Sequence, residues 1–367
     1  MMLDNAVTRF DKHTILVMAG GTGGHVYPAM AVADYLKEHG WQVVWLATEG
    51  GMENRLIEGK GYAKAMMTMQ GVRGKGFKGW LLLPVKLTKA LMQARSAIKQ
   101  HQPHVVLGMG GFAAFPGGLM AKLMGKPLIV HEQNSVAGLT NKVLSVIANR
   151  VLVAFPNVLS GQGLLVGNPV RQDLAQLPMP EKRYATQQGK LKLLVVGGSL
   201  GAAALNEVLP KALATLAEDV RPEVIHQAGE KHIEVLKRNY EQAGVKADAK
   251  AFIHDMAAAY AWADLVICRA GALTVAELAS VGVASVLVPF PFAVDDHQTT
   301  NAQYLAENGA AILVQQSAFD VAKATEILGE LTREKCMAMA VQAKKLAQPN
   351  ATVTVAKICM ECAFAGA

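Results

Sequence analysis

Near its amino end the chain reads HTILVMAGGTGGH over residues 13–25 and continues with VYPA over residues 26–29. This stretch predicts a buried strand, a glycine-rich turn and then a helix that begins near Pro28. Glycines let backbone N–H groups approach an anion closely, and a helix start adds unsatisfied donors and the positive end of its dipole. The stretch therefore predicts a phosphate-binding turn with His25 beside the phosphate. A tight turn without a ligand is the alternative, because such turns are common in α/β folds.

The turn differs from the dinucleotide-binding fingerprint. The pattern G-x-G-x-x-G, started at Gly21, needs a glycine where the chain has Val26. This difference argues against a nicotinamide cofactor. A second unit of the same design follows later in the chain: LKLLVV at 191–196 predicts a buried strand, GGSLG at 197–201 a turn, and residues 202–216 a helix.

Strands alternate with helices in both halves of the 367-residue chain, which predicts two domains with parallel, helix-covered sheets. Parallel sheets bind ligands at the carboxyl ends of their strands. We therefore expect a cleft in which one ligand reaches both glycine turns. Glycine and proline in VGNPVR at 166–171 predict the linker between the domains.

Composition favours a soluble enzyme. Hydrophobic residues make up 51% of the chain, enough for two cores, and its longest apolar run, 283–294, is interrupted by two prolines. Asp4 and Asp11 stand where a secretory signal would have its basic and apolar regions, so we expect a cytoplasmic protein. Four cysteines are few for this length, which agrees with a reducing compartment. The C-x-x-C at 359–362 has no second pair or nearby histidine and predicts helix packing without a metal.

The net charge of +7 is concentrated in one region, because no Asp or Glu occurs between Glu58 and Glu132. Within that region, GKGFKGWLLLPV at 74–85 mixes lysines with an apolar tip, as in segments that lie on anionic bilayers. A solvated basic face over a buried Trp-Leu loop is the alternative. Few aromatic residues, 6% of the chain, and no nucleic-acid-binding motif argue against nucleic acid as a partner. The predicted membrane-binding residues are Lys75, Lys78, Trp80, Leu81 and Leu82.

The second turn also matches G-x-S-x-G, the nucleophile elbow of serine hydrolases, with Ser199 as nucleophile. Asp264, Asp295 and His297 follow it in the order of a hydrolase triad. This alternative leaves the first glycine turn and the basic segment unexplained, whereas a serine that binds phosphate at a helix start accounts for the same residues. HEQNS at 131–135 lacks the second histidine of the zincin motif, so no zinc site is expected.

A further strand, glycine turn and helix is predicted around CRAGALTVAEL at 268–278. Thr274 and the neighbouring N–H groups are suited to a diphosphate, and Glu277 could accept both hydroxyls of a ribose. An acidic residue near the start of an exposed helix is the alternative for Glu277. DDHQTTN at 295–301 offers polar side chains for sugar hydroxyls, or else forms a solvated loop.

The motifs together resemble one family. The resemblance is carried by GGTGGH at 20–25 with Pro28, GMGGF at 108–112 with Pro116, HEQN at 131–134, GNPVR at 167–171, residues 271–277, and His297-Gln298 with Asn301. This ordered set is similar to the peptidoglycan N-acetylglucosaminyltransferases that convert lipid I to lipid II. The resemblance implies a GT-B fold, two Rossmann-like domains whose parallel sheets face a central cleft. It also implies UDP-GlcNAc as donor and undecaprenyl-diphosphate-MurNAc-pentapeptide as acceptor.

The resemblance further implies domain bounds and site residues. The domains would be an acceptor- and membrane-binding domain at 1–170, a UDP-GlcNAc-binding domain at 171–348, and a segment at 349–367 that packs back on the first domain. The expected location is peripheral, on the cytoplasmic face of the inner membrane, with other cell-wall synthesis proteins left open as partners. UDP-GlcNAc would be bound by Thr22, Gly23, Gly24, Asn134, Arg171, Ser199, the backbone of Ile253, Ala272, Leu273, Thr274, Val275, Ala276, Glu277 and Gln298.

The chemistry of such a transfer assigns a role to His25. The attacking hydroxyl must lose a proton, and histidine is the side chain that exchanges protons most readily near neutral pH, so His25 is the candidate general base. The chain contains no Asp-x-Asp, so we expect turn amides instead of a metal to stabilise the leaving diphosphate, and no cofactor. The alternatives from other classes are the serine hydrolase and a noncatalytic nucleotide- or lipid-binding protein.

Overall fold

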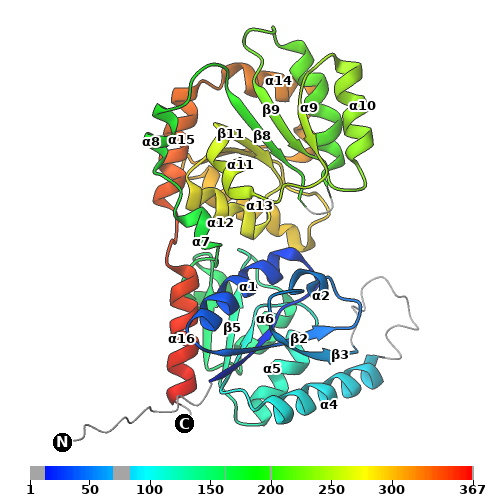
Figure 1. The fold of residues 1–367 in the computed structure, drawn as a ribbon, viewed down its shortest axis with the longest axis vertical. Helices are drawn as coiled ribbons and strands as arrows, with labels where there is room; N and C mark the ends of the chain where they lie inside the picture. The colour runs from blue at the N-terminus through cyan, green and yellow to red at the C-terminus, as the bar shows by residue number, and fades with distance from the viewer. Residues whose placement is uncertain (1–12, 69–82, 162, 199–200, 366–367) are drawn as a thin grey trace, which may run out of the picture. The chain divides into compact units, whose positions relative to one another are not determined.

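The computed structural model describes residues 13–68, 83–161, 163–198 and 201–365. These residues form two compact units, each with its own parallel sheet (Figure 1). Unit 1 contains the described residues up to Gln133 together with 137–166 and those from Thr352 onward, and unit 2 contains 134–136 and 167–351. Apart from the short segment 134–136, the chain changes unit at 166/167 and 351/352, where the sequence predicted 170/171 and 348/349.

Unit 1 is built on an all-parallel sheet. Successive residues of its first strand point to opposite faces, and both faces are apolar, which is the pattern of a strand covered on both sides. The strands are β1 (Thr14–Met18), β2 (Gln42–Thr48), β3 (Ala63–Met67), β4 (Val105–Gly108), β5 (Leu128–Glu132), β6 (Arg150–Val153) and β7 (Leu164–Leu165), in the order β3-β2-β1-β4-β5-β6-β7.

Helices cover both faces of this sheet (Figure 1). Ile15 and Val17 pack in one core with α1 (Gly23–Glu38) and α16 (Ala351–Ala365). Leu16 and Met18 pack in the other. The helices of that second core are α4 (Leu83–His101), α5 (Ala114–Leu123) and α6 (Leu139–Ser145); α2 (Glu53–Leu56) and the 3-10 turn η1 (Val158–Gly161) complete the described helical elements of the unit.

Unit 2 repeats the design. Its strands are β8 (Lys192–Val196), β9 (Glu223–Gln227), β10 (Asp248–Lys250), β11 (Leu265–Cys268), β12 (Ala284–Leu287) and β13 (Ala311–Leu313), parallel and ordered β10-β9-β8-β11-β12-β13. Its helices are α7 (Gln172–Ala175), α8 (Pro180–Ala185), α9 (Ala203–Thr215), α10 (Ile233–Ala243), α11 (Met256–Trp262), α12 (Ala272–Val281), α13 (His297–Ala306), α14 (Val321–Glu330) and α15 (Arg333–Lys345), with 3-10 turns η2 (Val294–Asp296) and η3 (Gln316–Ala318).

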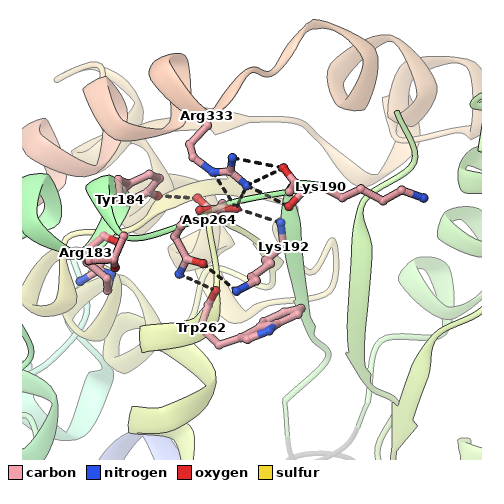
Figure 2. Close-up of polar contacts among 10 residues, drawn as sticks. Arg183, Tyr184, Lys190, Lys192, Trp262, Asp264 and Arg333 are labelled. Atoms are coloured by element: carbon pink, nitrogen blue, oxygen red, sulfur yellow. Dashed lines mark hydrogen bonds and ion pairs between the residues drawn. The ribbon is translucent and has the colours of Figure 1, made fainter. Parts of the chain in front are cut away.

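A polar cluster fixes the amino ends of β8 and β11 in unit 2 (Figure 2). Asp264, fully buried, accepts from the backbone N–H of Lys192 at 3.0 Å and from the Arg333 guanidinium, whose Nη2 lies 3.1 Å from the carboxylate. The same guanidinium donates to the carbonyls of Gly189 and Lys190. Loss of Arg333 would leave the fully buried Asp264 carboxylate without its charged partner, which is destabilising. Asp264 therefore serves the fold at the strand ends opposite those that precede the second glycine turn.

Candidate functional site

The turn after β1 forms the start of α1, which begins at Gly23 and not near Pro28 as predicted. Thr22 is extended, with φ −142°, and its carbonyl accepts from the N–H groups of His25 at 3.1 Å and Val26 at 3.2 Å. Helical hydrogen bonding therefore starts directly at the turn. The first N–H groups of any helix lack intrahelical partners, and here no side chain of Thr22 caps them. They are suited to an anion.

A buried carboxylate explains why the turn starts with glycine. Glu53 is fully buried, and its Oε1 accepts from the backbone N–H of Thr48 at 2.9 Å and from the Thr48 hydroxyl at 2.6 Å. A Cβ on Gly20 would stand 3.1 Å from that oxygen, and a Cβ on Gly51 only 2.2 Å from it. Glycine at both positions lets the carboxylate lie between the two loops. The buried, hydrogen-bonded Glu53 side chain thus supports the backbone of the turn at Gly20.

His25 is in the first turn of α1 and is only partly exposed. Its Nδ1 lies 2.7 Å from Oε1 of Gln133, a side chain that is 1% exposed. On another side the ring meets Gly110, where a Cβ would stand 3.0 Å from Nδ1 and Cε1 of the imidazole. Gly110 has φ +95°, a conformation that glycine adopts readily. Residues from the loops after β4 and β5 thus both lie against the imidazole.

In unit 2 the predicted ribose ligand, Glu277, lies in α12 beside Tyr260 and Arg171. The buried Tyr260 hydroxyl donates to Glu277 Oε2 at 3.1 Å. Burial raises the pKa of Glu277 from its ordinary value of 4.5 to about 7, and the Tyr260 hydroxyl and the Arg171 charge limit the rise. Arg171 also pairs with Asp173, Nε to Oδ1 3.5 Å. Glu277 is therefore poised to gain from a ligand that supplies hydroxyl donors.

The turn after β8 is held by backbone contacts. Gly198, with φ +80°, donates its N–H to Oε1 of Gln227 at 3.2 Å, and its carbonyl accepts from Gln227 Nε2 at 3.0 Å. Gln227 is 4% exposed and also donates to the Ala251 carbonyl. A Cβ on Gly197 would stand 2.7 Å from the backbone nitrogen of Ala202. Ser199, which follows Gly198, lies outside the described residues.

Asn134 groups with unit 2, although it follows β5 of unit 1. The fully buried Asn301 accepts from the backbone N–H of Ser135 at 2.9 Å, and its amide donates to the Asn134 carbonyl oxygen Oδ1 at 3.3 Å and to the carbonyl of Ala270. Ser135 Oγ also lies 2.6 Å from the hydroxyl of Thr300. These contacts explain why 134–136 depart from the contiguous domain that the sequence predicted.

The other predicted donor residues are placed as follows. Gly271 precedes α12, whose first residues are Ala272, Leu273 and Thr274, followed by Val275 and Ala276. Ile253 is buried between β10 and α11, and Gln298 Oε1 accepts from the backbone N–H of Phe290 at 2.9 Å. Unit 1 thus holds Thr22, Gly23, Gly24 and His25, and unit 2 the remaining described donor residues. The predicted membrane residues Lys75, Lys78, Trp80, Leu81 and Leu82 lie outside the described residues.

Four residues that touch the site were not assigned a role from sequence. Gln133 and Gly110 contact His25, Tyr260 contacts Glu277, and Gln227 contacts Gly198. Gln133 and Gln227 share one signal: each is a glutamine at or just after the carboxyl end of a parallel strand, where ligands and their supports gather. Among the described residues, no group of three or more His, Cys, Asp or Glu is arranged to hold a metal ion.

Comparison with known proteins assigns both units. Residues 15–153 match the glycosyltransferase family 28 N-terminal domain, and residues 192–356 match the glycosyltransferase family 28 C-terminal domain. The GT-B fold predicted from the sequence is confirmed. A crystal structure of MurG from Acinetobacter baumannii is similar, with a TM-score of 0.82 and 44% identity, covering 95% of this chain and 99% of that one.

Curated relatives are similar over nearly the whole chain. A protein of Nitrosospira multiformis is 54% identical over 352 residues, covering 95% of this chain and 99% of the relative. One of Ralstonia nicotianae is 55% identical over 355 residues, covering 96% and 97%. Both are named UDP-N-acetylglucosamine–N-acetylmuramyl-(pentapeptide) pyrophosphoryl-undecaprenol N-acetylglucosamine transferase. These matches give no support to the serine hydrolase alternative.

Proposed function

This chain belongs to glycosyltransferase family 28, and from that premise we propose that it transfers N-acetylglucosamine from UDP-GlcNAc to the C4 hydroxyl of MurNAc in undecaprenyl-diphosphate-MurNAc-pentapeptide. The observation that carries the proposal is that relatives named for this reaction align with almost every residue of the chain, His25 and Glu277 included in the aligned length. The product is lipid II of peptidoglycan synthesis. The resemblance of the sequence motifs points to the same substrates.

The described residues supply the parts that the reaction needs. His25 accepts the proton of the attacking hydroxyl as that oxygen bonds to the anomeric carbon, and the bond from that carbon to the diphosphate breaks with its electron pair on the UDP oxygen. Single displacement inverts the anomeric centre. Helix-start amides after Gly271 stabilise the charge on the diphosphate without a metal. Glu277 accepts the ribose hydroxyls.

The proposed function is tested by UDP release with a lipid I analogue as acceptor and UDP-GlcNAc as donor. We expect UDP release to require the acceptor, to yield a β-linked disaccharide and to persist in excess EDTA. A serine hydrolase would instead be labelled at Ser199 by a serine-directed phosphonate, and a noncatalytic binding protein would hold the acceptor without releasing UDP. Activity abolished by EDTA and restored by magnesium would overturn the proposal that turn amides suffice.

We also propose that unit 1 binds peripherally to the anionic cytoplasmic face of the inner membrane, where the acceptor's lipid chain is anchored. Among the described residues, no helix has the length and apolar character needed to cross a bilayer. The outer faces of α4, α5 and α6, which are packed side by side, combine exposed apolar and basic side chains, as membrane-surface segments do. They include Val85, Met92, Leu123, Leu139 and Val146, with Lys86, Lys89, Lys122 and Lys142.

Vesicle co-sedimentation tests this location. Changing Leu139 and Val146, which are 78% and 82% exposed, to Ser should weaken binding to anionic vesicles, and so should changing Trp80, Leu81 and Leu82 to Ser. Val220→Ser, an exposed apolar residue of unit 2, is the matched control. Turnover of a short-chain soluble acceptor should be unchanged in all of them. Equal sedimentation of variants and parent would contradict the proposed membrane surface.

A further inference from the structure

The imidazole of His25 has one ring nitrogen inside the protein. Nδ1 lies 2.7 Å from Oε1 of Gln133, which is a short hydrogen-bond distance. The donor in that bond depends on which ring nitrogen carries the proton, and on which end of the Gln133 amide faces the ring. The surroundings of Gln133 decide both questions.

The amide of Gln133 can take only one orientation. Its Nε2 lies 2.9 Å from the backbone carbonyl oxygen of His131 and 3.0 Å from Nδ1 of the same residue. A carbonyl oxygen only accepts hydrogen bonds, so the amide end that faces it must be the NH₂ group. Turning the amide over would bring two oxygens within 2.9 Å in a site where Gln133 is 1% exposed. The oxygen of Gln133 therefore faces His25.

An amide oxygen can only accept, so Nδ1 of His25 must carry a hydrogen. We infer that Gln133 is a positioning residue that holds neutral His25 as the Nδ1–H tautomer and so leaves the lone pair on Nε2. Gly110 contributes by leaving room for the ring, whose Nδ1 and Cε1 lie 3.0 Å from where a Cβ would stand. The His131 carbonyl, through Gln133, is the origin of the constraint.

This arrangement suits a general base, and in that respect the inference rests on the proposed transfer reaction. The proton of the attacking hydroxyl moves to Nε2, the hydroxyl oxygen bonds to the anomeric carbon, and the diphosphate leaves with the electron pair of the broken bond. The imidazolium that forms keeps its Nδ1–H···Oε1 bond and later releases the Nε2 proton to solvent. A neutral amide orients the ring in both protonation states and adds no negative charge, unlike a carboxylate at the same place.

Nitrogen NMR of histidine-labelled protein tests the tautomer without any substrate. The His25 signals are assigned by their loss in His25→Gln. We expect a pyrrole-type Nδ1 and a pyridine-type Nε2 in the parent protein, and a shift toward the Nε2–H form in Gln133→Leu. Gln187→Leu, which removes a bridging amide between Trp262 and Lys192, is the matched control and should leave the His25 signals unchanged.

Kinetics supply the second readout. Gln133→Leu should lower kcat by about 10- to 100-fold, because a base in the wrong tautomer must first reorient, while the donor KM stays within about threefold. Gln133→Glu in its protonated form donates its O–H to the His131 carbonyl oxygen and keeps an acceptor at Nδ1, so kcat should recover at low pH and fall again as the carboxyl ionises and its two oxygens face that carbonyl and the ring. A merely structural role would change neither the tautomer nor this pH dependence of kcat.

The outcomes separate the inference from the proposed function. A pyridine-type Nδ1 in the parent protein, or unchanged His25 signals in Gln133→Leu, would overturn the inference whatever the activity. If the protein shows the expected tautomer but releases no UDP with lipid I, the tautomer assignment stands and the proposed function is wrong. If Gln133→Leu does not fold, the parent spectrum and the pH profile of Gln133→Glu still decide.

Discussion

The two glycine turns occupy the same place in the two units, after β1 in unit 1 and after β8 in unit 2, yet a buried glutamine supports each in a different way. Gln133 reaches a side chain, the imidazole of His25. Gln227 reaches the backbone, accepting from the N–H of Gly198 and donating to its carbonyl. The turn of unit 1 thus presents an oriented imidazole. The turn of unit 2 presents backbone groups whose conformation is held by Gln227.

The difference between the two glutamines predicts different kinetic effects, on the rate of proton transfer in unit 1 and on donor affinity in unit 2. Orientation of a single ring nitrogen changes how fast a proton can move, and so acts on kcat, whereas a fixed backbone turn beside a ligand acts on affinity. Glu277, in unit 2, belongs with the second kind because it accepts a hydrogen bond from Tyr260, lies within the field of Arg171 and is suited to further hydroxyl donors. The comparison predicts that substitutions of His25 and of the residues that contact it lower kcat, and that substitutions of the donor residues in unit 2 raise the donor KM.

The largest effect is expected from His25→Ala. Loss of the general base should lower kcat by about 10²- to 10⁴-fold, with the donor KM within about threefold, because no described donor contact of unit 2 is touched. Steady-state kinetics with a soluble lipid I analogue measures both constants. His39→Ala, at the other end of α1 and exposed, is the control and should behave as the parent. If His25→Ala changes the donor KM more than kcat, the turn of unit 1 acts on donor affinity, as the turn of unit 2 does, and the inferred difference between them is wrong.

Gly110→Ala tests the loop that holds the imidazole. The new Cβ would stand 3.0 Å from Nδ1 and Cε1 of His25, so the ring must shift, and kcat should fall by about 10- to 100-fold. Gly125→Ala is matched to it, because Gly125 also has a positive φ, +68°, in unit 1 but no atom within 4 Å of the added Cβ. Both variants carry the backbone strain, so only their difference in kcat measures displacement of His25. Equal values of kcat in the two would show that the ring is not constrained there.

The sequence predicts features formed by neighbouring residues, and it does not reveal contacts between residues far apart in the chain. The strand, the glycine turn and His25 are neighbours in the chain, so periodicity and residue type were enough to predict them. Gln133 is 108 residues from its contact with His25, and only the pairing of β4 with β1 and β5 brings it there. The sequence predicts a later start for α1 because proline favours the first helical position, whereas helical bonding begins at the carbonyl of Thr22.

The same limit applies in unit 2. Glu277 could be singled out from its place in the helix, but its raised pKa depends on burial and on Tyr260, which no local pattern reveals. By its order along the chain, Asp264 fits a hydrolase triad. The fold places it at the amino ends of β8 and β11, bonded to Lys192 and Arg333 (Figure 2). Order in sequence could not distinguish the two ends of a strand.

Glu277→Ala should raise the donor KM by about 10- to 100-fold, the effect of losing hydrogen bonds to a charged acceptor, with a smaller rise for Glu277→Gln. Because the pKa of Glu277 is raised to about 7, the carboxylate is mostly ionised at pH 8 and mostly protonated at pH 6. The parent's donor KM should therefore increase as the pH falls through 7, while that of Glu277→Gln stays flat. Glu234→Ala, an exposed residue of α10, is the control. A parent KM independent of pH would show that the pKa of Glu277 is not raised into this range, and an unchanged donor KM in Glu277→Ala would exclude Glu277 as the ribose ligand.

Gln227→Leu sharpens the comparison most directly, because it matches Gln133→Leu residue for residue. Gly198 loses its two side-chain hydrogen bonds, so the turn should become less ordered and the donor KM should rise by about 3- to 10-fold with kcat nearly kept. Gln133→Leu should do the reverse. The pair is compared in one assay at saturating acceptor. If both variants lower kcat to the same extent, the two glutamines have the same role. The assignment of catalysis to the turn of unit 1 and of donor affinity to the turn of unit 2 would then be wrong.

The smallest effect on catalysis is expected from His226→Gln, which alters unit 2 beneath the turn without touching it. His226 is fully buried, its ring nitrogens 2.9 Å from the Tyr240 hydroxyl and 3.0 Å from Asn206 Oδ1, and burial lowers its pKa from 6.5 to about 3. The unfolded chain therefore takes up a proton at a pH where the folded chain does not, so stability is present above pH 6.5 and is lost as the pH falls toward 3. At pH 5 this loss is about 2 kcal/mol.

The variant removes that titration. Thermal unfolding followed between pH 7 and pH 5 should show a smaller fall in Tm for His226→Gln than for the parent, even if the variant starts from a lower Tm because its contacts to Tyr240 and Asn206 are poorer. His254→Gln, an exposed histidine of the same unit, should keep the parent's slope. Both kinetic constants should match the parent at pH 8, since His226 neither contacts Gly198 nor forms part of the α12 site. A parallel loss of Tm in variant and parent would show that another group controls the acid lability, and that His226 supports unit 2 equally in both charge states.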